Sequence, residues 1–247
     1  MKPVVAILFG REGSRGLPNK NIQTILGRPS LEYPLMAAKK SKIVRDIYVS
    51  TDSKKIEEIA SKYDSINLGR PKELCTDDAL LEDAIFFAFN QVDKLINDKE
   101  TLYLILLCNS VTINYKNIIM AHEMLENNNS LDSVTTIAKY NMYSPVRAKQ
   151  ISNSGNLSSF ISMESLKNTT DLSCDRDKST DCYFCDHSFT LSRRKTLITL
   201  KNNDYPFKWM GNNVGFIEQL PGGGDIDYQW QVPMAEWWLK EHGFSNN

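Results

Sequence analysis

Short apolar runs alternate with amphipathic segments along most of this chain, and this alternation constrains the fold more than any other feature of the sequence. Each apolar run has the length of a buried strand, whereas a segment such as 54–63 repeats its apolar residues at helical spacing. The alternation predicts βαβ units, and therefore an α/β fold with a Rossmann-like, mostly parallel sheet and helices on both faces. The predicted strands are 4–9, 47–50, 102–107 and 133–138, and the predicted helices are 31–41, 53–63, 79–96 and 115–126.

The rhythm breaks at about residue 140, where a stretch rich in Ser, Asn, Thr and Asp carries little periodicity. It resumes with predicted strands at 183–191 and 213–218 and a closing helix at 229–243. We therefore expect one domain over residues 1–247. Within it, residues 140–182 (the excursion) leave the main sheet as a flap or an oligomer contact.

The loop 9-FGREGSRGLPNKN-21 opens directly from the first predicted strand. Its glycines allow a tight turn that presents backbone N–H groups to an anion, and its cations supply charge-assisted donors to phosphate oxygens. The loop lacks the Gly-Lys-Ser/Thr of a Walker loop, and Pro18 delays the helix that a dinucleotide fingerprint would enter directly. The alternative is an ordinary surface loop with solvated charges. The residues concerned are Gly10, Gly13 and Gly16 with Arg11, Arg15 and Lys20.

A pair of carboxylates follows three glycines in 222-GGGDIDY-228. Asp225 and Asp227 lie two residues apart, so in an extended conformation both project from one face and Ile226 projects from the other. Two hard oxygen ligands suit Mg²⁺, which completes its coordination with water and substrate phosphates. The alternative is a polar turn, but an anion-binding loop at the other end of the chain favours the metal site, because polyphosphate chemistry needs both parts.

Other kinds of site fit the sequence less well. Cys174, Cys182, Cys185 and His187 resemble a zinc set superficially, but regular alternation in 183–191 would place Cys182 and Cys185 on opposite faces of a strand. No Ser or Cys nucleophile motif accompanies the histidines. The net charge of −1 gives no global basic field for nucleic acid or anionic lipid.

The chain has no basic-then-apolar leader and no apolar run long enough to span a membrane. Its five cysteines are an odd number scattered over a long chain, as in proteins with free thiols. We therefore expect a cytoplasmic location and no membrane partner.

The loop resembles that of the acylneuraminate cytidylyltransferases, with the CMP-Kdo synthetases as more distant relatives. The family motif reads roughly Arg-x-x-Ser-Lys/Arg-Gly-Leu-Pro-x-Lys-Asn, and residues 11–21 fit it from Arg11 to Asn21. Further similarity lies in 49-VSTDS-53, in 70-RPKEL-74 followed by Asp77, and in the late pair Asp225 and Asp227.

The resemblance implies an enzyme that transfers CMP from CTP to the anomeric hydroxyl of a sialic-acid-like 2-keto-3-deoxy sugar acid, with release of pyrophosphate. It also implies a Mg²⁺ cofactor and a homodimer whose excursion crosses to the partner. Catalytic roles fall to Arg11, Arg15, Lys20 and Asp227, and metal binding to Asp225 and Asp227. By motif position, the nucleotide-binding residues are Arg11, Gly13, Ser14, Arg15, Lys20, Asn21, Arg70 and Asp77.

The chain departs from the family pattern where the sugar is expected to bind. The segment 108-CNSVT-112 replaces Gln-Pro-Thr-Ser-Pro, and Asp186 with His187 replaces Asn-Gly. The predicted sugar-binding residues are Cys108, Asn109, Ser110, Arg176, Asp186 and His187. Two alternatives stay open: a nucleotidyltransferase for another sugar or nucleotide, and a nucleotide-sugar-binding protein with reduced catalysis.

Overall fold

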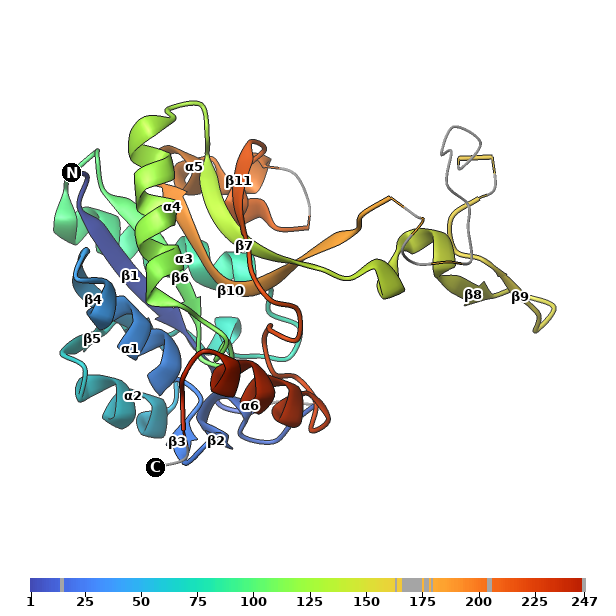
Figure 1. The fold of residues 1–247 in the computed structure, drawn as a ribbon. Helices are drawn as coiled ribbons and strands as arrows, with labels where there is room; N and C mark the ends of the chain where they lie inside the picture. Colours follow the sequence, from blue (N-terminus) through green and yellow to red (C-terminus); the bar gives the residue numbers. More distant parts are fainter. Residues whose placement is uncertain are drawn as a thin grey trace.

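The computed structural model of the protein describes residues 1–13, 16–162, 164–165, 175, 178, 180–203 and 206–245. Within these ranges a seven-stranded sheet has the strand order β11-β7-β10-β6-β1-β4-β5 (Figure 1). Neighbouring strands are parallel except at β10, which is antiparallel to both β6 and β7. The mostly parallel sheet is therefore confirmed. The strands are β1 (Val4–Phe9), β4 (Val44–Ser50), β5 (Ser65–Asn67), β6 (Leu102–Leu107), β7 (Ser133–Lys139), β10 (Tyr183–Arg193) and β11 (Val214–Glu218).

Helices cover both faces of this sheet, as the continuous apolar strands predict. Along β1, Val4, Ala6 and Leu8 face one hydrophobic core and the alternate residues face the other. The first core is closed by α1, α2, α4 and α6, and the second by α3 and α5. Because both faces of β1 are buried, this strand is apolar at every position. The helices are α1 (Glu32–Ser41), α2 (Lys54–Ser61), α3 (Leu81–Ile96), α4 (Tyr115–Asn127), α5 (Arg194–Ile198) and α6 (Gln231–Glu241).

The predicted elements are confirmed, with differences at polar positions. The strand predicted at 47–50 begins earlier, at Val44, because Arg45 and Asp46 belong to its exposed start. The short edge strand β5 lacks an apolar run and was not predicted. Short antiparallel pieces, β2 (Thr24–Ile25) and β3 (Arg28–Pro29), follow the loop after β1.

Strand β10 contains an irregularity that simple alternation did not predict. Cys185 pairs with Ile137 and Thr190 with Thr135, so residues 186–189 form a bulge in the ladder with β7. His187 within it has φ 55°, a left-handed conformation that is uncommon for a residue with a side chain. The prediction of regular alternation over 183–191 is therefore wrong at this point. Among the described residues, no three His, Cys, Asp or Glu side chains are grouped to hold a metal; Cys174 lies outside them.

The excursion leaves the sheet between β7 and β10 and projects away from the body of the molecule (Figure 1). Its described part contains a hairpin of β8 (Lys149–Ile151) and β9 (Leu157–Ser159). The hairpin lies away from the body of the molecule, and Ile151 and Leu157 are 78% and 75% exposed (Figure 1). In the part of the chain that the structure describes, no helix has the length and apolar character needed to cross a membrane.

Candidate functional site

The candidate site lies where the parallel strands end at their carboxyl edge. The segments after β1, β6, β7 and β11 meet there, and β10 brings its amino-terminal half to the same edge because it runs antiparallel. In open α/β sheets this edge is where ligands bind, since neighbouring strand ends leave a crevice between their loops. Residues far apart in the sequence are thus brought together by strand order.

Two glycines of the loop after β1 are required by close packing. A Cβ at Gly10 would lie 2.4 Å from Sγ of Cys108, and a Cβ at Gly16 would lie 2.5 Å from the carbonyl oxygen of Asp227. Gly13 has φ 73°, in the left-handed region that favours glycine. The loop therefore lies directly against the segment that carries the carboxylate pair. Ser14 and Arg15, two predicted nucleotide-binding residues, lie outside the described residues.

Two cations of the loop, Arg11 and Lys20, are held by carboxylates. Arg11 Nη2 donates to Asp77 Oδ1 at 2.6 Å, and Lys20 Nζ donates to Asp227 Oδ1 at 2.5 Å. Asn21 donates from its side chain to the carbonyl oxygen of Arg11 at 2.8 Å, which fixes the backbone of the loop. The structure thus brings together Arg11, Lys20, Asn21, Asp77 and Asp227, all predicted members of the site.

Arg70 lies beside this group, and its Nε atom is buried. Its Nε has no hydrogen-bond partner among the described residues. Burial is the main cause that lowers the pKa of Arg70, and Arg11 contributes in the same direction, while Cys75 and Asp52 oppose it. A buried donor without a partner is rare in folded proteins, and a ligand acceptor would satisfy it. This placement suits the predicted contact with the nucleotide.

The carboxylate pair is held in an extended segment. Asp225 forms an antiparallel bridge with Ser110, and Ile226 donates its N–H to the carbonyl oxygen of Asn109 at 3.0 Å. The side chain of Asn109 donates back to the carbonyl oxygen of Ile226 at 3.2 Å. Ile226, which lies between the two acids in the sequence, is 1% exposed. Its side chain therefore points into the core, as the two-residue spacing predicts.

The charges of the pair suit a divalent cation. Burial raises the pKa of Asp225, and the negative charge of Asp227 raises it further, while His187 and Lys20 lower it. Two carboxylates that repel each other provide the hard oxygen ligands that Mg²⁺ takes, and within the described ranges no third protein ligand joins them. The remaining ligands of such an ion would be water and substrate phosphates, so the residues present fit a Mg²⁺ that acts with a nucleotide.

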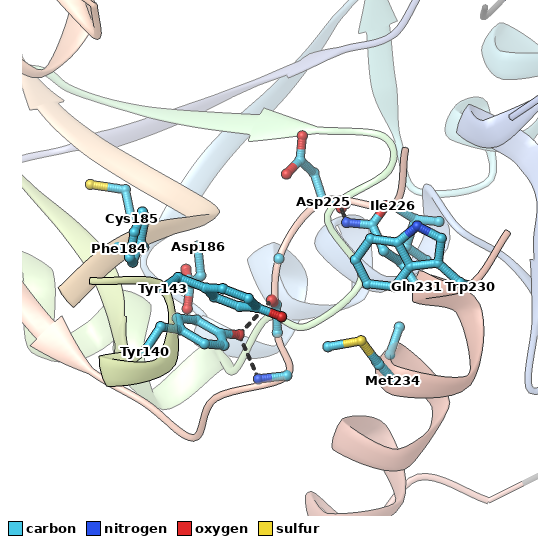
Figure 2. A pocket seen from close by; sticks show the side chains of 14 residues that line it. Tyr140, Tyr143, Phe184, Cys185, Asp186, Asp225, Ile226, Trp230, Gln231 and Met234 are labelled. Atoms are coloured by element: carbon cyan, nitrogen blue, oxygen red, sulfur yellow. Dashed lines mark hydrogen bonds between the residues drawn. The ribbon is translucent and has the colours of Figure 1, made fainter. Parts of the chain in front are cut away.

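A cavity of about 220 Å³ opens beside Asp225 (Figure 2). Its walls are mainly aromatic and apolar, and among the described lining residues there is no Lys or Arg. Asp186 lines it from the bulge of β10. The lining residues are Tyr140, Tyr143, Phe184, Cys185, Asp186, Gly222, Gly223, Gly224, Asp225, Ile226, Trp230, Gln231, Met234 and Ala235.

The other predicted sugar-binding residues that the structure describes do not line this cavity. Cys108 is fully buried beneath Gly10, and Asn109 and Ser110 are buried behind the carboxylate pair, where they hold its backbone. The His187 ring packs edge-on against Phe207, with ring centroids 4.7 Å apart. Arg176 lies outside the described residues.

Asp186 is held in a network that the sequence did not reveal. Its carboxylate is buried and accepts hydrogen bonds from the Thr136 hydroxyl, the Ser188 N–H and the side-chain amide of Gln219. Burial raises the pKa of Asp186, although these donors oppose the shift. The residues come from β7, β10 and the end of β11, so only the strand order β11-β7-β10 brings them together.

Side chains outside the predicted set hold the glycine-rich segment before Asp225. The Tyr140 hydroxyl accepts from the N–H of Gly222 at 2.6 Å, and Thr112 Oγ1 accepts from the N–H of Gly224 at 2.8 Å (Figure 2 shows the Tyr140 bond). The sequence signal that could have identified Tyr140 and Thr112 was their position, because each follows a predicted strand by a few residues at the edge of the sheet where ligands bind.

Comparison with known proteins decides the family. A family model described as a cytidylyltransferase matches residues 5–205. The chain belongs to the cytidylyltransferase family. It is 41% identical over 76 residues to the N-acylneuraminate cytidylyltransferase of Escherichia coli O18:K1:H7, across 31% of this chain and 18% of that protein. It is 34% identical over 94 residues to the CMP-N,N'-diacetyllegionaminic acid synthase of Legionella pneumophila, across 36% of this chain and 40% of that protein.

The alignments thus cover less than half of the length of these two relatives. The fold of this cytidylyltransferase family member is also found among solved structures. A CMP:2-keto-3-deoxy-manno-octonic acid synthetase in complex with CTP has a TM-score of 0.66 to it, with 14% sequence identity over 97% of this chain and 99% of that chain. At this level of identity the match shows a shared fold, and it supports the fold class predicted from the sequence.

Proposed function

We propose that this member of the cytidylyltransferase family transfers CMP from CTP to the anomeric hydroxyl of a sialic-acid-like 2-keto-3-deoxy sugar acid, and releases pyrophosphate. The observation that carries the proposal is the meeting of Lys20, from the glycine-rich loop, with Asp227, from the carboxylate pair. A triphosphate needs cationic donors on one side and a metal on the other. Lys20 would supply such a donor and Asp227 a ligand for the metal, and the two side chains are in contact at the carboxyl edge of the sheet.

Each residue has a role that its position supports. Arg11, Lys20 and the loop N–H groups bind the triphosphate, and Asn21 and Arg70 lie along the nucleotide. Asp225 and Asp227 would hold Mg²⁺, which supplies positive charge to the phosphates as negative charge moves to the leaving pyrophosphate. The chain's own contribution is positioning, because phosphoryl transfer requires little covalent chemistry from the protein.

The cavity beside Asp225 suits a sugar acid that carries N-acyl groups. Tyr143, Phe184, Trp230 and Met234 offer apolar surface to an acyl methyl group, and Asp225 places the cavity next to the proposed metal. The two named relatives act, by their names, on N-acylneuraminate and on N,N'-diacetyllegionaminic acid, both N-acylated. We therefore assign an N-acylated sugar acid as the acceptor. The role of Arg176 stays a prediction.

The test is pyrophosphate release with Mg²⁺, measured with CTP, ATP, GTP and UTP. Each nucleotide is combined with 2-keto-3-deoxy sugar acids that carry or lack N-acyl groups and, separately, with sugar phosphates. The expected result is release with CTP and an N-acylated acid only. Release with another nucleotide or with a sugar phosphate would overturn the proposed substrates. Nucleotide binding with no release from any pair would favour a binding protein.

We also propose that the excursion forms a homodimer contact. A two-stranded hairpin is marginally stable in water when nothing covers it. The hairpin of β8 and β9 nevertheless presents Ile151, Leu157 and the adjacent Phe160, which are 78%, 75% and 63% exposed. A second copy of the chain would bury these side chains and so stabilise the hairpin.

A further inference from the structure

Gln231, the first residue of α6, lies against the backbone of the carboxylate pair. Its side-chain Oε1 accepts hydrogen bonds from the N–H of Asp227 at 2.7 Å and of Tyr228 at 2.8 Å. Its Nε2 donates to the carbonyl oxygen of Asp225 at 3.2 Å. One side-chain amide therefore contacts the main chain of both acids. Figure 2 shows Gln231 reaching from the helix toward Asp225.

This contact uses both ends of the amide. An amide combines an acceptor oxygen with a donor nitrogen, and a carboxylate or a methyl group cannot reproduce that combination. The shorter side chain of Asn would not extend as far from the same helical position. Gln is thus chemically suited to join a carbonyl oxygen and two N–H groups that belong to one extended segment.

The segment needs such a restraint because of its composition. Gly222 and Gly224 precede Asp225 with φ values of 92° and 134°, and glycine adds backbone freedom on that side. Asn109 bonds the two peptide groups that flank the Ile226 Cα, through the N–H and the carbonyl oxygen of Ile226. The two acids also repel each other when both are charged. Gln231 bonds the opposite ends of the same two peptide groups, at the carbonyl oxygen of Asp225 and the N–H of Asp227, and so holds the segment from its other side.

We propose that Gln231 is a positioning residue that holds Asp225 and Asp227 at the separation needed to bind a divalent cation together with the nucleotide. This inference rests on the proposed function. Gln231 itself is not a metal ligand, since its amide atoms are already bonded to the backbone. The competing explanation is that the side chain only stabilises the turn that leads into α6, because the two N–H groups it bonds belong to Asp227 and Tyr228, which precede the helix.

Two variants separate these explanations. Gln231→Glu keeps an acceptor for the N–H groups of Asp227 and Tyr228, but it places a charged oxygen against the carbonyl oxygen of Asp225. Gln231→Ala removes all three of these side-chain hydrogen bonds. Gln229→Ala is the matched control, because Gln229 is exposed and two residues away along the chain.

The experiment titrates Mn²⁺ into each protein with CTP present and sugar absent, and detects bound metal by electron paramagnetic resonance. Thermal unfolding and the KM values for CTP and for the sugar acid are measured in parallel. We expect both Gln231 variants to bind Mn²⁺ about 10- to 100-fold more weakly, with a similar fall in kcat, as is typical when a partner that orients metal ligands is removed. Gln229→Ala should match the unchanged protein.

Three other outcomes would contradict the proposed role of Gln231, each in a different way. Lower thermal stability with unchanged Mn²⁺ affinity well below the unfolding temperature would show that Gln231 only stabilises the turn that leads into α6. A raised KM for the sugar acid with unchanged Mn²⁺ affinity would make Gln231 a substrate contact instead. If the unchanged protein bound no Mn²⁺ in the presence of CTP, the metal site of the proposed function would fail, and this inference with it.

Discussion

Lys20 donates to Asp227 at 2.5 Å across 207 positions of the sequence, and so joins the glycine-rich loop to the carboxylate pair. In this arrangement the ammonium group of Lys20 neutralises a carboxylate that we assign to a metal. A triphosphate would attract Lys20, and Asp227 would then be available to the cation. Nucleotide and metal should therefore bind cooperatively.

Replacement of Lys20 by Met tests this coupling. Without the ammonium group, we expect Mn²⁺ to bind the nucleotide-free protein more tightly, because Asp227 loses a competing cation. We expect CTP affinity to fall, together with kcat/KM by roughly 10²-fold or more, since a donor to the phosphates is lost. Mn²⁺ titrations with and without CTP measure both effects. Lys39→Met, in an exposed pair with Asp64, is the control. Unchanged Mn²⁺ affinity without nucleotide would contradict the coupling.

Asp227→Asn tests the metal assignment itself. A neutral amide is a poorer ligand for Mg²⁺, so turnover at saturating substrates should fall by about 10²-fold or more. The fold should be little affected, because the Asp227 side chain is 41% exposed. Pyrophosphate release across Mg²⁺ concentrations, with thermal unfolding in parallel, checks both statements. Asp64→Asn serves as an exposed control. Mg²⁺-dependent turnover at the original rate would remove Asp227 from the site.

Gly16→Ala tests the close approach of the loop to the carboxylate pair. The added Cβ would lie 2.5 Å from the carbonyl oxygen of Asp227, so one of the two segments must move. We expect kcat/KM to fall by at least about tenfold, because small displacements of positioned groups are costly in phosphoryl transfer. Gly155→Ala is the control for backbone strain without a collision, because an added Cβ meets nothing within 4 Å there although φ is 79°. Equal activity of both variants would show that the loop tolerates the displacement.

Asp186 predicts a pH dependence of stability. Burial raises the pKa of its carboxyl above the unfolded value, so the folded protein binds this proton more tightly than the unfolded chain does. The resulting contribution to stability is fully present below about pH 4, the unfolded pKa, and is lost as pH rises through the folded pKa. Asp186→Asn removes the titrating group, so its melting temperature relative to the unchanged protein should increase with pH. Calorimetry from pH 4 to 7 measures the difference.

The exposed Asp181 supplies the control for that experiment, since its pKa is lowered by Lys139 and Asn141. The Asp181→Asn difference should change in the opposite direction with pH. A melting-temperature difference for Asp186→Asn that is constant with pH would mean that Asp186 titrates alike in the folded and unfolded states.

The proposed dimer contact is tested by placing charges on the hairpin. Ile151→Asp with Leu157→Asp should convert a dimer into a monomer, because burying two carboxylates at an apolar interface is unfavourable. Light scattering after size-exclusion chromatography measures the mass. Ile66→Asp, on edge strand β5, is the matched control, with an apolar side chain that is also exposed. A monomeric unchanged protein, or a dimer that survives the double change, would argue against this contact.

Much of the fold follows from local patterns. The apolar run at 4–9 is buried on both faces, and the stripe of α2 places Ile56 and Ala60 in the core, as periodicity predicts. The pattern failed at residues 186–189, a bulge that contains Asp186 with its hydrogen bonds from Thr136 and Gln219. Periodicity carries no information about those partners, since they belong to other strands.

The sequence by itself determined the alternation of strands and helices, the glycine-rich loop with Arg11 and Lys20, and the pair Asp225 and Asp227. Each of these is set by residues close together in the chain, through side-chain periodicity or backbone freedom. The tertiary structure alone decided that Lys20 meets Asp227, that Asp186 is buried and bonded, and that Gln231 holds the acid pair. The contact between Lys20 and Asp227 depends on strand order and register, which a local pattern does not specify.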